Sequence, residues 1–313
     1  MEVTGMQECI IELKQLSKAY RSRTVLHPID LQLYRGEIFG LIGRNGAGKS
    51  TLLKLLGGLI YPTGGSVRLF ERSTREQRSL HERMGLLVES PGLYTQMSGF
   101  DNMELLADAY GMKLRKPRIE ELLDRVGLAD SGRRKVKEYS LGMKQRLGIA
   151  LALLGSPDVL VLDEPINGLD PQGIVDIRHL LLELNRTGLT IVIASHILEE
   201  LSKMANRFGI LHEGRLVEIV TRDELLQQCE QRIEIRLAEP EAAIPILETE
   251  LGIRRYKLLD SQLLQVYDEH AELYPIHAAL AKGGVTVHGI ARQQVSLEQY
   301  FLERTGSGGE RDA

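Results

Sequence analysis

A glycine-rich loop constrains this chain more than any other feature. An apolar run at 38–42 precedes the loop and predicts a buried strand, and a leucine-rich stretch at 51–56 predicts a helix after it. In that context, glycines let successive backbone amides and the helix N-terminus face one anion, so the pattern predicts a phosphate-binding site rather than a chance turn. The loop consists of Gly43, Arg44, Asn45, Gly46, Ala47, Gly48, Lys49, Ser50 and Thr51. Lys49 would bring its charge to the outer phosphates and Ser50 its hydroxyl to magnesium.

Composition limits what else the chain can be. The 313 residues are enough for two domains, and 43% hydrophobic with 26% charged residues is the balance of a globular protein. The formal net charge of -4 does not favour binding of nucleic acid through overall charge. Cys9 and Cys229 are far apart and lack metal-ligand spacing, which argues against a disulfide framework or a zinc site.

Targeting and membrane segments are not indicated by the sequence. Residues 1–5 lack the basic and apolar pattern of a secretion signal. The most apolar long stretch, 147–162, is interrupted at 155–158 and falls short of the roughly 18 apolar residues that a membrane-spanning helix needs. We therefore expect a cytoplasmic protein whose membrane role, if it has one, depends on a partner.

Hydrophobic periodicity divides the chain into a large α/β part, 1–221, and a smaller C-terminal part. Within the first part, residues 9–42 alternate as strands do, and a helical subdomain is expected at about 90–155. Apolar runs at 159–162 and 190–194, separated by a helical pattern, predict neighbouring strands of a parallel sheet.

The C-terminal part has its own series of strand and helix patterns. Strands are predicted at 232–237, 263–266 and 285–287, with helical segments from Glu241 and near 271–281. We interpret residues 222–304 as a small α+β domain of βαββαβ type, followed by a disordered tail at 305–313.

Two carboxylates follow the apolar run at 159–162. A buried strand would deliver Asp163 and Glu164 to its C-terminal edge, where Asp163 would hold magnesium and Glu164 would polarise the water that attacks the γ-phosphorus. The alternative is an acidic loop that caps the next helix. The phosphate-binding loop upstream favours the magnesium site.

Three further motifs resemble those of the ATP-binding cassette (ABC) ATPases. Residues 139–146 read Tyr-Ser-Leu-Gly-Met-Lys-Gln-Arg and resemble the signature motif, 167–170 resemble the D-loop, and His196 resembles the switch histidine. With the two phosphate-site motifs, known in this family as Walker A and Walker B, they follow the family's order from residue 9 to about 220. The resemblance implies an α/β P-loop NTPase cassette, with a RecA-like core, a β-subdomain and a helical subdomain, plus the small C-terminal domain.

The resemblance also implies how the site works. Two copies would face each other head to tail, so that each ATP lies between the Walker A of one copy and the signature of the other, which comprises Ser140, Leu141, Gly142 and Met143. His196 would contact the γ-phosphate and the attacking water. Asp170 would connect the two sites, although an aspartate before proline is equally a helix cap. Tyr20 matches the aromatic residue that stacks on adenine, the alternative being a tyrosine on a strand face, and such stacking would also admit GTP.

One loop departs from the family pattern. Glu89 stands where most members carry glutamine, and a carboxylate only accepts hydrogen bonds where an amide also donates. A glutamate followed by Ser90 and Pro91 resembles the bacitracin and lantibiotic self-protection subfamily of bacterial ABC exporters. At this position Glu89 would also bind magnesium, with Ser50 and Asp163. The alternative is a tolerated loop substitution with no bearing on the substrate.

Together these resemblances imply the ATP-hydrolysing subunit of a bacterial ABC transporter that exports a peptide antibiotic or another drug, with ATP and Mg²⁺ as cofactors. Its partners would be a second cassette and a separate transmembrane permease, docked near 94–102, which places the chain on the inner face of the cell membrane. No nucleic acid is expected. The alternative is a soluble ABC-type ATPase that acts on ribosomes or DNA. The C-terminal domain carries no ligand motif, which favours dimer contact or stabilisation over binding of a small regulator.

Overall fold

The computed structural model describes residues 8–74, 78–113, 115–229, 231–260, 262–268, 271–293 and 296–306. The chain forms two compact units that divide between Arg222 and Asp223. Each unit has a hydrophobic core of its own. The first unit carries every motif of the phosphate site.

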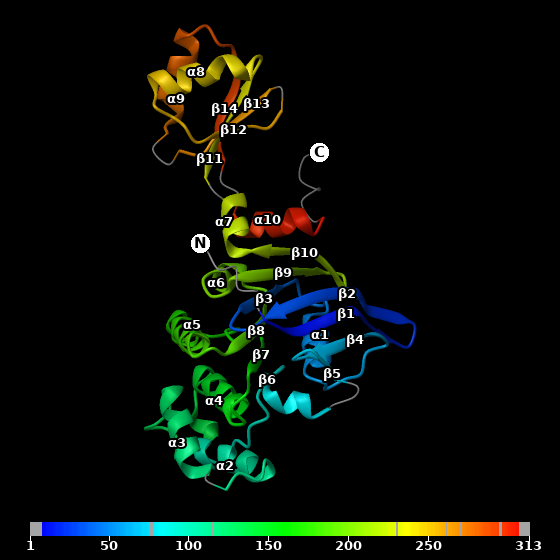
Figure 1. Cartoon of the computed structure of the whole chain (residues 1–313). Coiled ribbons are helices and arrows are strands. Elements are labelled where there is room, and N and C mark those ends of the chain that lie inside the picture. Colours follow the sequence, from blue (N-terminus) through cyan, green and yellow to red (C-terminus); the bar gives the residue numbers. More distant parts are fainter. Residues whose placement is uncertain are drawn as a thin grey trace. The chain divides into compact units, whose positions relative to one another are not determined.

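A six-stranded sheet forms the centre of the first unit (Figure 1). The strand order is β10-β9-β3-β8-β7-β6, and all neighbours are parallel except β9 and β10. The inner strands β3, β7 and β8 are buried along their whole length, which explains their continuous apolar runs. The strands are β3 Ile38–Ile42, β6 Met84–Leu87, β7 Val159–Asp163, β8 Thr190–Ser195, β9 Arg207–His212 and β10 Arg215–Thr221.

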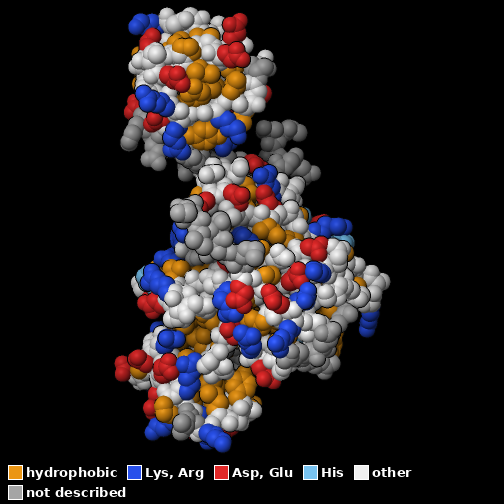
Figure 2. All heavy atoms as spheres, viewed as in Figure 1, with side chains coloured by type: hydrophobic (Ala, Val, Ile, Leu, Met, Phe, Trp, Pro, Cys, Tyr) orange, Lys and Arg blue, Asp and Glu red, His pale blue; other side chains and the backbone are white. Residues whose placement is uncertain are grey.

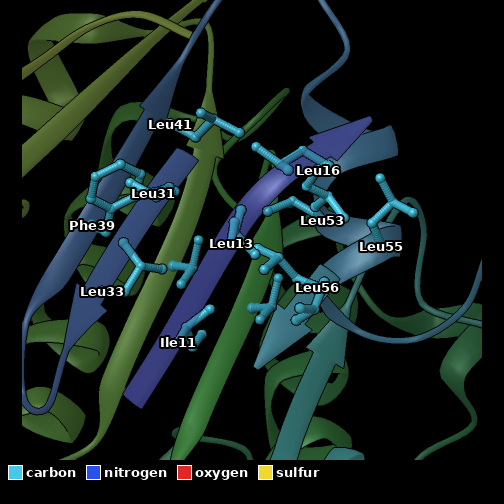
Figure 3. Packing of buried hydrophobic residues seen from close by; sticks show 14 of the residues in the cluster. Ile11, Leu13, Leu16, Leu31, Leu33, Phe39, Leu41, Leu53, Leu55 and Leu56 are labelled. Atoms are coloured by element: carbon cyan, nitrogen blue, oxygen red, sulfur yellow. The ribbon is translucent and has the colours of Figure 1, made fainter. Parts of the chain in front are cut away.

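A second, antiparallel sheet covers the helix that follows the phosphate loop. Its strand order is β2-β1-β4-β5, with β1 Cys9–Tyr20, β2 Arg23–Tyr34, β4 Gly64–Leu69 and β5 Arg72–Ser73. Helix α1, Lys49–Leu56, buries Leu53, Leu55 and Leu56 in the same cluster as Ile11 and Leu13 of β1 (Figure 3). This cluster also contains residues of β3, β7 and β8, so α1 is packed against both sheets. The start of α1 is therefore held firmly at the end of β3.

The helices of the first unit other than α1 fall into two groups. The helical subdomain contains α2 Gly99–Ala109, α3 Arg115–Arg125 and α4 Leu141–Leu153, with the 3₁₀ segment η2 Val136–Glu138 between α3 and α4. Helices α5 Pro171–Arg186 and α6 Leu198–Ser202 contact the six-stranded sheet, and the 3₁₀ segment η1 Arg78–Arg83 leads into β6. Ser98 begins α2 with a capping box shared with Asp101. Among the residues that the structure describes, no helix has the length and apolar character to cross a membrane.

The second unit begins with most of α7 and ends with α10, and between these helices the order of elements is β11-α8-β12-β13-α9-β14. The bounds are α7 Arg222–Gln228, β11 Arg232–Leu237, α8 Pro240–Glu250, β12 Tyr256–Leu258, β13 Leu263–Val266, α9 Leu273–Lys282, β14 Val287–Gln293 and α10 Leu297–Arg304. The sheet is antiparallel with the order β12-β13-β11-β14. Ile233, Ile235 and Leu237 alternate into a core shared with Leu247 of α8 and Leu280 of α9.

The C-terminal elements differ in detail from those expected. The last strand, predicted at 285–287, begins at Val287 and runs to Gln293, and β12 was not identified because it has only three residues and two of them are exposed. Thr305, which we predicted to lie in a disordered tail, is instead buried at the C-terminus of α10, and its hydroxyl donates to the Phe301 carbonyl at 3.0 Å. Residues 307–313 of the predicted tail lie outside the described residues.

Candidate nucleotide site

The carboxyl ends of three adjacent strands meet at one edge of the six-stranded sheet. Strand β3 leads into the phosphate loop, β7 ends at Asp163, and β8 ends at Ser195. The order β3-β8-β7 places these ends side by side. Ligands of parallel α/β sheets bind at such an edge. The topology thus brings the phosphate loop, Asp163 with Glu164, and His196 to one place.

The phosphate loop has the backbone that its glycines predict. Gly46 and Gly48 have φ angles of 83° and 107°, a region that glycine enters without steric cost. The turn between β9 and β10 is hydrogen-bonded to the loop, because the Gly214 amide donates to the Ala47 carbonyl at 3.0 Å. Lys49 is buried and its Nζ donates to the Gly43 carbonyl at 2.7 Å. The loop therefore presents the N-terminus of α1 at the sheet edge, an arrangement that favours an anion.

Glu164 contacts the two other predicted catalytic residues, Lys49 and His196. Its Oε1 lies 3.2 Å from Lys49 Nζ, and its Oε2 lies 2.9 Å from His196 Nδ1. The Glu164 backbone has φ 50°, which is unfavourable for a residue with a side chain, and its amide donates to the Ala194 carbonyl at 2.9 Å. Strained backbone of this kind concentrates at functional sites. A carboxylate held between a lysine and a histidine at a phosphate loop is suited to act as a general base.

Asp163 has a buried carboxylate oxygen that is suited to bind Mg²⁺. Its side chain is 5% exposed, and burial raises the pKa of its carboxyl while a hydrogen bond from the Ser50 hydroxyl lowers it. The Oδ1 atom is buried without a hydrogen-bond partner. A carboxylate oxygen beside a hydroxyl fits Mg²⁺, which takes one or two protein ligands and completes its shell with phosphates and water. The described residues contain no group of three or more His, Cys, Asp or Glu side chains that could hold a metal ion.

Glu89 lies beside this site, and its carboxylate forms an ion pair with Lys54. Its side chain is 65% exposed, and Oε1 lies 2.5 Å from Lys54 Nζ on α1. This hydrogen bond raises the pKa of Lys54. The structure thus places Glu89 on a lysine rather than on Ser50 and Asp163. Lys54 lies outside the sequence motifs; the only signal in the sequence is its position four residues after Ser50, on the same face of a helix.

Tyr20 ends β1 and is 47% exposed. The ammonium of Lys18 lies 4.7 Å from the centre of its ring. The ring lies near Lys54 of α1 and contributes, after Glu89, to the raised pKa of that lysine. An exposed ring here is free to stack on a base, and a purine on its face would gain from the neighbouring cation.

Most residues of the predicted signature and D-loop, but not Met143 or Asn167, line one hollow. Its volume is about 390 Å³, and its described lining includes no residue of the phosphate loop. Ser140 is the N-cap of α4 and accepts from the Met143 amide at 3.2 Å, while Leu141 is 53% exposed. Asp170 is the N-cap of α5 and accepts from the Gly173 amide at 3.2 Å, so the helix-cap alternative holds for this residue in the isolated chain. The hollow also contains Gly142, Arg146, Gly168, Leu169, Gln172, Asp176 and Ile177.

The chain is similar in sequence to known proteins. A model of the ABC transporter family matches residues 26–167. The bacitracin transport ATP-binding protein BcrA of Enterococcus faecalis is 39% identical over 306 residues, which cover 97% of this chain and 99% of that protein. This chain belongs to the ABC transporter ATP-binding family. The lantibiotic transport ATP-binding protein SrtF of Streptococcus pyogenes is 42% identical over 208 residues, which are 66% of this chain and 89% of SrtF.

Solved ABC cassettes have the same fold. The ATP-binding subunit of an ABC transporter, 32% identical, matches with a TM-score of 0.63 over 70% of this chain and 92% of its own. A dimeric ATP-binding cassette in a post-hydrolysis state with ADP and Pi, 26% identical, matches with a TM-score of 0.62 over 68% and 99%. The chain is accordingly an ATP-binding and ATP-hydrolysing subunit of the ABC transporter family.

Proposed function

We propose that this ABC subunit energises the export of a peptide antibiotic or a related drug through a separate transmembrane permease. The observation that carries the proposal is the end-to-end similarity to a bacitracin transport ATP-binding protein, because it includes the C-terminal unit as well as the cassette. The glutamate at position 89 points to the same subfamily. The relatives are transporter subunits, which does not favour the alternative of an ATPase acting on ribosomes or DNA.

The geometry supports hydrolysis of ATP by an activated water. In this mechanism Glu164 accepts a proton from water, the water oxygen bonds to the γ-phosphorus, and the bond to the β-phosphate oxygen breaks to leave ADP and Pi. His196, 2.9 Å from Glu164, would orient the carboxylate, and Lys49 would neutralise the outer phosphates. Magnesium, held by Ser50 and Asp163, would supply further neutralisation of phosphate charge.

The separation of the signature from the phosphate loop supports a head-to-tail homodimer. Ser140, Gly142 and Asp170 share one hollow, and none of the phosphate-loop residues lines it. A helix N-terminus that begins at Ser140 favours an anion, so a second copy could present its γ-phosphate there. Dimeric cassettes are among the similar structures. In such a dimer Asp170 would lie between the two nucleotides.

A hollow in the helical subdomain is the best candidate for permease docking. Its volume is about 840 Å³, and it is bounded by η1 and β6, by α2, and by the end of α4. Hydrophobic side chains reach the surface in the region of α2 and α4 (Figure 2), and Tyr110 in the lining is 58% exposed. Docking here would place the chain on the inner face of the membrane. The lining residues lie within 81–86, 106–112 and 151–156. Docking near 94–102, as the sequence predicts, is a separate prediction that this hollow does not test.

The Glu164→Gln variant tests the proposal. We expect it to keep ATP bound but to lose hydrolysis about 10²- to 10⁴-fold, since a positioned general base contributes that much. Tagged Glu164→Gln protein, purified from gently solubilised membranes of its native cell with ATP, should bring down a polytopic membrane protein in roughly equal amount. Wild-type protein without ATP is the matched control. Recovery with ribosomes or DNA and no membrane protein would overturn the transporter proposal and leave the ATPase intact.

A further inference from the structure

An ion pair joins the loop after β6 to the helix after the phosphate loop. Lys54 Nζ of α1 and Glu89 Oε1 are 2.5 Å apart. The Lys54 side chain is 31% exposed and stands on a helix packed against both sheets, whereas that of Glu89 is 65% exposed and stands on a loop. Glu89 has φ 68°, an unfavourable conformation for a residue with a side chain. The lysine is therefore the anchored member of the pair, and it determines where the carboxylate lies.

The pair lies next to the phosphate site. Lys54 follows Ser50 by four residues, so both side chains lie on one face of α1. After the hydrogen bond to Glu89, the nearby Asp163 carboxylate also raises the pKa of Lys54, and Glu89 adds to the raised pKa of Asp163, which is due mainly to burial. The edge of the site therefore carries three carboxylates, Asp163, Glu164 and Glu89, where a cassette with glutamine at position 89 would carry two. Each extra negative charge opposes the approach of a triphosphate.

We propose that Lys54 is a positioning residue that neutralises Glu89 and holds its carboxylate away from the phosphates. The lysine–glutamate pair then has no net charge, like the neutral glutamine amide that it replaces. The inference rests on the proposed magnesium and ATP site. Lys54 lies outside the ABC motifs. With this lysine, a chain that has a glutamate at position 89 avoids repelling its nucleotide.

Loss of the Lys54 charge should weaken Mg-ATP binding only while Glu89 is present. In Lys54→Met the carboxylate is unpaired, and we expect Mg-ATP to bind about three- to tenfold more weakly, the effect of one unit charge several ångströms away in a solvated site. Lys54→Arg keeps the charge and should bind like the wild type. Lys54→Met with Glu89→Gln removes both charges and should restore wild-type affinity. A lysine that only stabilised the fold would not be rescued by Glu89→Gln.

Equilibrium binding to the full-length chain provides the test. A fluorescent N-methylanthraniloyl ATP would be titrated with Mg²⁺ and with EDTA, and thermal unfolding without nucleotide would confirm that each variant is folded. Lys116→Met is the matched control, because Lys116 pairs with Glu120 at 4.0 Å on α3 in the helical subdomain. Wild-type affinity in Lys54→Met, or failure of Glu89→Gln to restore affinity, would overturn the proposal.

A separate variant distinguishes failure of this proposal from failure of the magnesium site. Asp163→Asn should lose the gain in affinity that Mg²⁺ gives, whatever residue stands at position 54. If Asp163→Asn behaves so while Lys54→Met binds normally, the magnesium site stands and the role of Lys54 is wrong. If Asp163→Asn responds to Mg²⁺ as the wild type does, the site on which both proposals rest is wrong.

Discussion

Two glycines of the phosphate loop share a left-handed backbone and differ in their surroundings. Gly46 has φ 83°, and a Cβ added there would meet no atom within 4 Å. Gly48 has φ 107°, and a Cβ there would lie 2.7 Å from Leu26 Cδ2 and 3.2 Å from the Val25 carbonyl oxygen. The first glycine is required by backbone conformation alone. The second is also required by the close approach of β2.

Alanine substitutions should separate these two effects. Gly46→Ala should lower the free energy of unfolding by about 1–2 kcal/mol through the left-handed backbone alone. Gly48→Ala should cost about 1–3 kcal/mol more, because it also overpacks the contact with Leu26. Urea unfolding of the nucleotide-free protein measures both. Equal losses in the two variants would show that the crowding seen at Gly48 relaxes without cost.

At the scale of elements, Asp158 connects three segments at the amino-terminal edge of the central sheet. It precedes β7, and its carboxylate accepts from Arg83 Nε of η1 at 2.7 Å and from Arg35 Nη1, ahead of β3, at 3.3 Å. Its amide also donates to the Arg83 carbonyl at 2.9 Å. The hydrogen bond from Arg83, followed by that from Arg35, holds the pKa of the Asp158 carboxyl below its ordinary value. The carboxylate form therefore stabilises the folded state.

Asp158→Asn should lower the free energy of unfolding by about 1 kcal/mol at pH 7, the value of a good partly exposed ion pair. Because the pKa is lowered on folding, the contribution is present above the unfolded pKa of about 4 and is lost as pH falls through the folded pKa. The difference between wild type and variant should therefore shrink on acidification. Urea unfolding at several pH values checks this, with the exposed Asp130→Asn as control. A difference independent of pH would contradict the charge argument.

At the scale of the whole molecule, each proposed ATP site needs residues from two copies. Lys49→Met removes the phosphate-loop cation, and Ser140→Arg blocks the signature. Each variant alone should be inactive. Mixed in equal amounts, they should recover about a quarter of the wild-type rate, because random pairing makes half of the dimers mixed, with one of two sites complete. Steady-state ATP hydrolysis of the mixture measures this, and a mixture no more active than its components would argue against the proposed dimer.

Much of the nucleotide site could be predicted from sequence because its parts are local. The phosphate loop, Asp163 with Glu164, and His196 each follow a buried apolar run, and parallel strands carry their carboxyl ends to one edge. The fold class followed from the same runs, since strand, helix and strand in succession require a parallel sheet. The small C-terminal sheet was harder to predict, because a three-residue strand such as β12 has too short a pattern to detect.

The fold class, the ligand class and the residues of the phosphate loop could be predicted from the order of residues alone, since they depend on short patterns of burial and backbone geometry. The partner of each charged group, in contrast, depends on the folded arrangement. Glu164 contacts Lys49 and His196, and Glu89 contacts Lys54, because strand order and the packing of α1 bring together pairs of residues that are 115, 32 and 35 positions apart in the sequence. Spacing along a chain does not encode such neighbours, because they arise only when the sheet has assembled.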